Sequence, residues 1–310
     1  MSIEQSTGTI LMVRPANFGF NTETAENNVF QDDETELSID EIKDRARQEF
    51  DNMVTILRSH GVDVTIIEDT MEPAKTDAIF PNNWISTHND GSVYTFPMFS
   101  PNRRLERRTD IIDSLSLQYK VTIDESLLAF ESSDKYLEGT GSMILDRPNK
   151  IIYACYSVRT DKEILDTYGK KLGYKVVGFD AVDSDGIQYY HTNVIMTLGE
   201  QIAILCTESI EDPDEKKAVV QSLEDSGKEI VHITREQVLQ YAGNMLEVQG
   251  TDTKKLMVMS KSAFKALSKD QLHIIKNRNK IVYCSLETIE KFGGGSARCM
   301  IAEIFLPKSK

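Results

Sequence analysis

The sequence predicts an α/β fold: a five-bladed propeller in which each blade is a pseudo-symmetric ββαβ unit. The main observation is a repeat, because a helical pattern followed directly by a short apolar strand occurs five times. The aligned strand positions are Val64, Val121, Val176, Ile230 and Ile281. Successive positions lie 57, 55, 54 and 51 residues apart. Further short strands follow each pair, separated by a few residues rich in Gly, Asn or Asp, which is typical of hairpins. An open, doubly wound sheet would need long parallel crossovers, so a radial arrangement fits better.

The first helix is predicted over residues 38–61. Ser38 and Glu41 form a capping-box pattern, apolar residues then recur at helical spacing, and Gly61 is a natural stop. Four later helices are predicted over residues 104–117, 160–172, 213–225 and 260–276. The strands that follow these four contain the strings QYKVTID, GYKVVGF, GKEIVHI and RNKIVYC.

Length and composition limit the classes of function. The chain has 310 residues, 40% of them apolar, which is an ordinary globular balance and enough for a large core. No low-complexity linker or Pro-rich hinge interrupts it, so residues 1–310 are predicted to form a single domain. Thirty-five Lys and Arg against 49 Asp and Glu give a net charge of −14. This charge argues against a nucleic acid or an anionic membrane surface as a partner.

The sequence also indicates a compartment. Its longest uncharged stretch, residues 186–199, is too short to span a bilayer, and no basic segment precedes the apolar string TILMV. The four cysteines are far apart in sequence, and a chain of this size needs no disulfides. We therefore expect a cytoplasmic protein with no membrane segment.

One position of the repeat carries reactive residues. Counted forward from the aligned strand positions, the same loop-to-strand position holds Asn83, Glu138, His191, Asn244 and Cys299. In a radial fold these positions converge near the axis. A Cys, a His and a Glu that meet there would supply a nucleophile, a proton carrier and a carboxylate partner.

Each of these three residues also has a structural alternative. Cys299 follows GGGSAR, whose glycines let the backbone bend and approach a ligand closely. The other cysteines sit in apolar strands and are expected to be structural. His191 alone would more often be a hydrogen-bonded core histidine. Glu138 would be either a surface strand end or a buried carboxylate that needs a partner or a function.

Motifs for cofactors and metals are weak or absent. GTGS and GGGS lack the third glycine of a dinucleotide loop, and no P-loop is present. No CxxC, HxxxH or EF-hand spacing occurs. We expect neither a cofactor nor a metal. The basic run RRLERR, residues 103–108, is most simply a solvated helix face.

Five ββαβ units with Glu, His-Thr-Asn and a Gly-rich loop before a C-terminal Cys resemble the guanidino-group modifying enzymes of the pentein α/β-propeller fold. This superfamily includes arginine deiminase, dimethylarginine dimethylaminohydrolase and the amidinotransferases. The resemblance covers essentially the whole chain. The strings TILMVRPANFGFN, FPNNW, LEGTGSMILDR, YSVRTD, YHTNVIM and GGGSARCM are similar to its citrulline-hydrolysing branch, the citrulline ureidases.

The resemblance implies roles for five residues. Cys299 would be the nucleophile, His191 would shuttle protons, and Glu138 would hold and orient substrate N–H groups. Arg159, in YSVRT, matches a position that commonly binds the α-carboxylate of the amino acid. Arg103 is a second carboxylate candidate, with a surface helix charge as its alternative.

Two departures from the guanidino enzymes concern the substrate. Those enzymes typically carry an Arg-Asp pair where this chain has Asn82-Asn83, and often an Asp where it has Asn193. A carboxylate suits a guanidinium, which offers only donors, whereas an amide NH₂ suits the carbonyl oxygen of a neutral ureido group. The sequence therefore favours citrulline as the small-molecule substrate, unless these positions are only turn residues.

The predicted reaction is hydrolysis of citrulline to ornithine, ammonia and carbon dioxide through an S-carbamoyl intermediate on Cys299. The alternative is a guanidino-group hydrolase of the arginine deiminase, dimethylarginine dimethylaminohydrolase or agmatine deiminase type, which would use the same three residues. A more remote alternative is a non-catalytic binding protein, because the superfamily also includes a ribosome anti-association factor. The sequence is compatible with a homo-oligomer and does not specify the oligomeric state.

Overall fold

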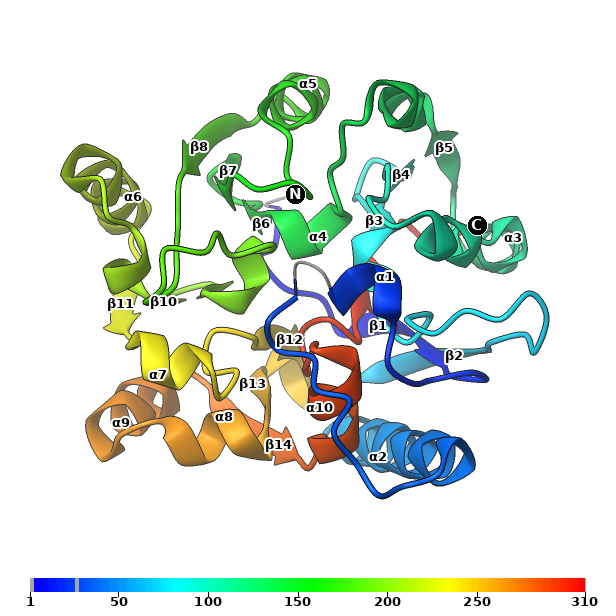
Figure 1. Ribbon diagram of the computed structural model, residues 1–310. Helices are drawn as coiled ribbons and strands as arrows, with labels where there is room; N and C mark the ends of the chain where they lie inside the picture. The colour runs from blue at the N-terminus through cyan, green and yellow to red at the C-terminus, as the bar shows by residue number, and fades with distance from the viewer. Residues whose placement is uncertain (1–2, 26–27, 310) are drawn as a thin grey trace.

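Five three-stranded sheets surround a common centre in the computed structural model, with the longer helices on the outside (Figure 1). The structure describes residues 3–25 and 28–309, so the predicted domain boundaries at 1 and 310 lie outside the described residues. In each sheet the middle strand pairs antiparallel with one neighbour and parallel with the other. This arrangement confirms the five-bladed α/β propeller that the repeat predicts.

Four blades follow the order ββαβ along the chain. The first contains β3 (Ile85–Thr87), β4 (Ser92–Thr95), α3 (Thr109–Ser116) and β5 (Thr122–Asp124). The second contains β6 (Ile144–Asp146), β7 (Ile151–Cys155), α5 (Lys162–Leu172) and β8 (Lys175–Phe179). The third contains β9 (Met196–Leu198), β10 (Ile202–Leu205), α6 (Pro213–Asp225) and β11 (Glu229–His232). The fourth contains β12 (Leu246–Gln249), β13 (Lys255–Ser260), α8 (Lys261–Ala266), α9 (Lys269–Arg278) and β14 (Lys280–Cys284).

The fifth blade joins the two ends of the chain. Its middle strand, β1 (Thr9–Arg14), pairs in parallel with β2 (Asp63–Glu68) after the helix α2 (Ile39–Ser59). It also pairs antiparallel with β15 (Ala302–Glu303). The strand that follows Cys299 is thereby tied to the first strand of the chain, which fixes the position of the C-terminal Gly-rich loop.

Short helical turns connect the blades. The described α-helical turns are α1 (Thr22–Ala25), α4 (Gly139–Ser142), α7 (Arg235–Val238) and α10 (Glu287–Gly293). The 3₁₀ turns are η1 (Pro81–Asn83), η2 (Pro101–Glu106), η3 (Ser126–Ser133), η4 (Thr192–Val194), η5 (Thr207–Ser209) and η6 (Thr251–Thr253). Several of them directly precede a blade's first strand, so they set where that strand begins.

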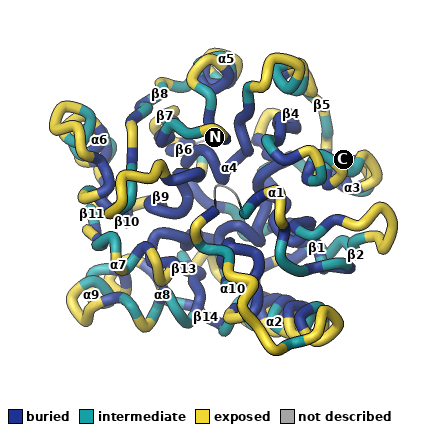
Figure 2. Tube along the Cα trace, viewed as in Figure 1, coloured by how far each residue is buried: buried dark blue, intermediate teal, exposed yellow. Residues whose placement is uncertain are grey.

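Helix α2 shows how the sequence forms an outer layer. Ser38 caps it, with Glu41 N–H donating to Ser38 Oγ at 3.3 Å and Ser38 N–H donating to the Glu41 carboxylate at 2.8 Å. Its apolar positions at helical spacing are buried, whereas its other face is exposed. Buried residues dominate around the centre of the propeller, and exposed ones lie on the peripheral helices and loops (Figure 2).

Two predicted helices are divided, and in both cases the boundaries from the sequence are wrong. Residues 104–117 split into η2 and α3 because Arg108 has an extended backbone. Residues 260–276 split into α8 and α9 because Leu267 is extended and Ser268 starts a new capping box with Gln271. The expected solvated face at 103–108 is also wrong in part, since Arg103 is buried.

Candidate active site

The five residues of the repeat position meet at the centre of the propeller. Asn83 ends η1, Glu138 precedes α4, His191 precedes η4, Asn244 precedes β12, and Cys299 precedes β15. An arginine contacts both Asn83 and Glu138. Glu138 also contacts His191, and Asn244 contacts Cys299. All five are buried, with Cys299 the most exposed at 4%. The structure therefore brings together the residues that the spacing singled out.

Glu138 is held rigidly and is ionised. Its Oε2 lies 2.8 Å from His191 Nε2, and its Oε1 accepts a hydrogen bond from the Phe99 N–H at 3.0 Å. Its own N–H donates to Ser142 Oγ at 2.9 Å. Burial by itself would raise the pKa of Glu138, but the charge of Arg159, the contact with His191 and the charge of Arg103 together lower that pKa well below its usual range.

His191 is neutral at physiological pH. Burial lowers its pKa from 6.5 to about 4, and this effect outweighs the attraction of Glu138. The anionic Glu138 carboxylate can only accept a hydrogen bond, so His191 Nε2 must be the donor. The neutral imidazole therefore carries its proton on Nε2 and a lone pair on Nδ1. A neutral imidazole fixed in this way is a competent proton acceptor.

Cys299 is surrounded by side-chain amides. Asn193 Nδ2 lies 3.4 Å from its Sγ, and Asn244 Nδ2 lies 3.2 Å from it. By contrast, burial raises the pKa of Cys155 and of Cys284 to about 12 in each case. Those two thiols remain protonated at neutral pH, which agrees with the structural role expected for them.

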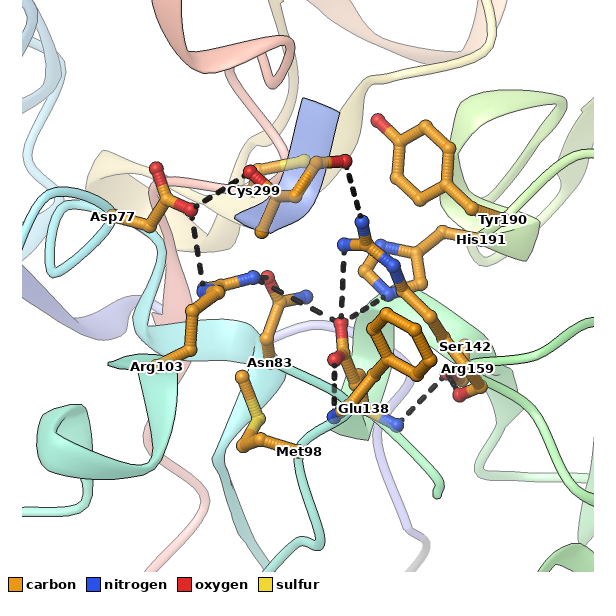
Figure 3. A network of polar contacts seen from close by, with 12 residues as sticks. Asp77, Asn83, Met98, Arg103, Glu138, Ser142, Arg159, Tyr190, His191 and Cys299 are labelled. Atoms are coloured by element: carbon orange, nitrogen blue, oxygen red, sulfur yellow. Dashed lines mark hydrogen bonds and ion pairs between the residues drawn. The ribbon is translucent and has the colours of Figure 1, made fainter. Parts of the chain in front are cut away.

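Arg103 belongs to a buried polar network with Asp77, Asn83 and Glu138 (Figure 3). It also makes a two-pronged ion pair with Glu106, with Nε and Nη2 donating at 2.8 and 2.9 Å. Its Nη1 donates to Asn83 Oδ1 at 3.0 Å and lies 3.8 Å from Glu138 Oε2. Its Nε is also 3.5 Å from Asp77 Oδ2. The alternative of a surface helix charge is thereby wrong, since Arg103 is 3% exposed.

Arg159 lies on the other side of Glu138. Its Nη1 is 3.6 Å from Glu138 Oε2, and its Nη2 donates to the Thr24 carbonyl at 3.1 Å. Its guanidinium also stacks 4.9 Å from the centre of the Tyr190 ring. Two arginines thus flank the carboxylate that touches His191 (Figure 3).

A cavity opens onto these groups. Its walls include Thr24, Asn28, Asp77, Phe80, Asn83, Arg103, Arg159, Tyr190, His191, Gly293, Gly294, Gly295 and Cys299. Two buried polar atoms in these walls, Asp77 Oδ1 and Asn83 Nδ2, have no hydrogen-bond partner among the described residues. Buried polar groups normally have partners, so unpaired ones in a cavity indicate a ligand-binding surface.

Not every predicted residue lies in this cavity wall. Asn193 is outside the set of wall residues but reaches Cys299, and its Oδ1 is unpaired. Asn82 is fully buried and is not in the wall, and in the part of the chain that the structure describes neither of its side-chain polar atoms has a hydrogen-bond partner. Asp77 was missed by sequence reasoning. The sequence feature that could have identified Asp77 is its place directly before the apolar run AIF, because this run is expected to be buried and leads to Asn83.

The glycines of the GTGS string allow two blades to approach each other closely. A β-carbon on Gly141 would stand 2.3 Å from Asn83 Nδ2 and 2.8 Å from His191 Nδ1. Gly139 has φ of +49°, and a β-carbon there would stand 2.4 Å from the Asn82 carbonyl oxygen. Only glycine fits at either position without displacing a residue of the site.

The described residues contain no cluster of three or more His, Cys, Asp or Glu side chains arranged to hold a metal ion. Within the same part of the chain, no helix combines the length and the apolarity needed to cross a membrane.

The fold and the converging site define a member of the pentein superfamily. A model of the family N,N dimethylarginine dimethylhydrolase, eukaryotic, matches residues 14–306, so the chain belongs to this family. No curated protein matches it significantly.

Solved structures agree with the fold. The N-terminal domain of ArgZ, an arginine dihydrolase from the ornithine-ammonia cycle in Cyanobacteria, is 16% identical with a TM-score of 0.73, over 96% of this chain and 99% of that one. AgrE in complex with L-arginine is 16% identical with a TM-score of 0.75, over 97% of this chain. A dimethylarginine dimethylaminohydrolase adduct with S-methyl-L-thiocitrulline is 15% identical with a TM-score of 0.61, over 95% of this chain and 98% of that one. The chain spans only 40% of full-length ArgZ and 41% of that AgrE chain.

Proposed function

We propose that this protein is a cysteine-dependent hydrolase that cleaves the ureido group of L-citrulline to L-ornithine, ammonia and carbon dioxide. The observation that carries the proposal is the orientation of the Asn83 amide. Arg103 donates to Asn83 Oδ1 at 3.0 Å, so the amide's acceptor is occupied and its unpaired NH₂ donor faces the site. The reverse orientation would set NH₂ against a guanidinium, donor against donor.

An unpaired donor matches a ureido substrate. The carbonyl oxygen of a ureido group is an acceptor, whereas a guanidinium offers only N–H donors. A site built around such a donor discriminates strongly against an analogue that leaves the donor unpaired in the closed site. Asn83 Nδ2 is therefore our candidate for holding the ureido oxygen, and Glu138 for accepting ureido N–H groups.

The amino-acid end of the substrate needs two opposite charges. The unpaired Asp77 Oδ1 supports binding of the α-ammonium group, and Arg159 remains our candidate for the α-carboxylate. Arg103 is a weaker candidate for that role, because Glu106 and Asn83 already take its donors. We propose that Arg103 instead positions Asn83.

The proposed reaction has two stages. His191 Nδ1 takes the thiol proton as Cys299 Sγ bonds to the ureido carbon. The C–N bond to ornithine then breaks, the proton goes to the leaving amine, and Cys299 carries a carbamoyl group. In the second stage water attacks this carbon, the S–C bond breaks and the thiol regains a proton. The carbamic acid released decomposes, so citrulline and water give ornithine, carbon dioxide and ammonia.

The second candidate is a guanidino-group hydrolase acting on arginine or a methylated arginine. The family model and the solved structures above favour it over citrulline hydrolysis. The cavity carboxylate Asp77 also suits a cationic group, as does Glu138, which contacts the wall residue His191. This enzyme would use the same nucleophile and proton carrier, so only the identity of the substrate separates the two candidates.

The test is to incubate the purified protein with citrulline and, separately, with arginine, and to quantify ornithine, citrulline and ammonia. The Cys299→Ser variant runs alongside. We expect ornithine from citrulline, lost at least 10³-fold in the variant. Citrulline formed from arginine, with citrulline itself inert, would replace the ureido proposal by the guanidino one and keep the thiol chemistry.

A further inference from the structure

Cys299 has two amide donors rather than a cation as its hydrogen-bonding neighbours. Asn193 Nδ2 and Asn244 Nδ2 both lie within 3.4 Å of Sγ. Papain-like and related thiols gain their reactivity from a neighbouring histidinium or another cation. Here His191 is neutral at pH 7, since burial lowers its pKa to about 4. A thiolate at Cys299 therefore needs another source of stabilisation.

The proposed substrate does not supply a positive charge next to the Cys299 sulfur either. A guanidinium would bring a positive charge next to the sulfur, but a ureido group is neutral. This step rests on the proposed function. With a neutral substrate, the protein itself must stabilise the thiolate.

We propose that Asn193 and Asn244 form an amide pair that stabilises the Cys299 thiolate through two N–H···S hydrogen bonds. Hydrogen bonds to an ionised acceptor are roughly twice as strong as neutral ones, so donors set around the sulfur favour the thiolate over the thiol. Asn244 thereby becomes a catalytic residue, because it touches the reacting atom.

The surrounding contacts fix the Asn244 amide in the orientation that this role requires. Asn244 Oδ1 accepts from the Arg298 N–H at 3.0 Å. The Cys299 thiol, when protonated, can also donate to this oxygen at 3.7 Å, whereas only Nδ2 can donate to the thiolate. Asn244 Nδ2 also donates to the Asn193 carbonyl at 3.0 Å, which ties the two asparagines together. The other titratable or charged groups that line the cavity beside the sulfur or interact with it are Asp77, Arg103, Arg159, Tyr190, His191, Tyr241 and Arg298.

Aspartate substitutions test the pair. Asn193→Asp and Asn244→Asp each replace one N–H donor by a carboxylate oxygen of nearly the same shape. The readout is the rate at which iodoacetamide alkylates the peptide containing Cys299, measured by mass spectrometry from pH 5 to 10. We expect a rate at pH 7 at least tenfold lower in each variant and a midpoint at least one pH unit higher. Asn17→Asp adds the same charge at a site outside the cavity wall and should leave the profile unchanged.

The two variants differ in their folding risk. Asn244→Asp keeps the acceptor for Arg298, and Asn193→Asp alters an amide whose oxygen has no internal partner. A thermal melt checks both, and Asn193→Asp decides the question if Asn244→Asp does not fold. An unchanged alkylation profile in the folded variants would overturn the proposal, even if citrulline turnover falls. A shifted profile in a protein that does not hydrolyse citrulline would keep the amide pair and reject the citrulline proposal.

Discussion

Two buried cavities lie on either side of the same loop, and they differ in how their polar groups are satisfied. Cys299 lines the reaction cavity described above, whereas its neighbour Arg298 lines a second one, here called the inner cavity. The inner cavity is walled by Gln5, Thr140, Ile144, Leu145, Arg147, Thr197, Leu198, Met245, Leu246, Glu247, Arg298 and Glu303. No residue is shared between the two walls.

The polar side chains that line the inner cavity have hydrogen-bond partners within the protein. Gln5 donates to the Leu145 carbonyl at 2.9 Å and accepts from the Arg147 N–H at 3.0 Å. Arg298 pairs with Glu303 at 3.2 Å. Among the described residues, none of the side-chain atoms that lack a hydrogen-bond partner belongs to the inner wall, whereas Asp77 and Asn83 contribute two to the reaction cavity. The two cavities therefore differ in their walls, because polar groups are paired in the inner wall and two are left for a ligand in the reaction cavity.

The largest expected effect concerns stability at the inner cavity. Glu247 accepts from Ser6 Oγ at 3.1 Å, Asn279 Nδ2 at 2.7 Å and the Glu200 N–H at 3.0 Å. Glu247→Leu would leave three donors without an acceptor, at about 1 kcal/mol each, so we expect unfolding to become about 3 kcal/mol easier. Denaturant unfolding measures this. The comparison fails if the folded variant also loses kcat/KM more than twofold, because the two cavities would then not be independent.

The next effect concerns activity at the reaction cavity. Gly141→Ala would push a methyl group against Asn83 Nδ2 and His191 Nδ1, at distances of 2.3 and 2.8 Å from the built β-carbon. A displacement of about 1 Å in a catalytic group can cost about 10²-fold, so we expect kcat/KM to fall about 100-fold. Gly19→Ala is the matched control, since a β-carbon on Gly19 meets nothing within 4 Å. Wild-type kinetics in Gly141→Ala would show that these two groups do not act on the substrate.

A smaller effect tests how Asn83 is oriented. Burial raises the pKa of Glu106 to about 7. Its carboxylate accepts two hydrogen bonds from the Arg103 guanidinium. Glu106→Gln loosens Arg103 and lets the Asn83 amide turn, so the preference for citrulline over arginine should fall about tenfold. A purely structural role would lower kcat/KM for both substrates equally and leave their ratio unchanged. Asp110→Asn, which removes the exposed partner of Arg108 in the next turn, should also leave the ratio unchanged.

The sequence alone predicted which five residues of the repeat meet at the centre of the propeller. The repeat spacing placed Asn83, Glu138, His191, Asn244 and Cys299 in one structural position, and the structure brings them together. That prediction depended on counting along the chain, which a regular propeller preserves. It did not assign Asn244 a role, because its contact with the sulfur depends on the Arg298 N–H from another blade.

What the sequence did not provide depends on tertiary packing. Arg103 belongs to a run of six residues with four arginines, which is typical of a solvated surface, yet Glu106 and Asn83 bury it. Asp77 carries no motif, and its unpaired oxygen is visible only once the cavity walls are assembled. A run of charged residues therefore does not predict that every member is exposed. Arg103 is buried because Glu106, three residues further on, is a buried carboxylate that pairs with it.

The smallest expected effect on stability compares two buried histidines. Burial lowers the pKa of His191 to about 4 and that of His88, which lies 2.9 Å from Tyr168 Oη, to about 3. The unfolded chain protonates each histidine below its ordinary value of 6.5, and the folded protein does not do so until much lower pH. Each histidine therefore contributes stability above pH 6.5 that is lost as the pH falls towards its folded value, about 1 kcal/mol by pH 5.5.

Replacing either histidine should remove that loss, so between pH 7.5 and 5.5 His191→Gln and His88→Gln should each lose about 1 kcal/mol less free energy of unfolding than the wild type. Denaturant unfolding at the two pH values measures this. Activity should separate the pair, because only His191 reaches the reaction cavity: we expect His191→Gln to lose kcat about 10²–10⁴-fold and His88→Gln to retain it. An acid-induced loss in His191→Gln as large as in the wild type would mean that His191 is not buried in its neutral form. The proton acceptor assigned to Cys299 would then have to be sought elsewhere in the cavity wall.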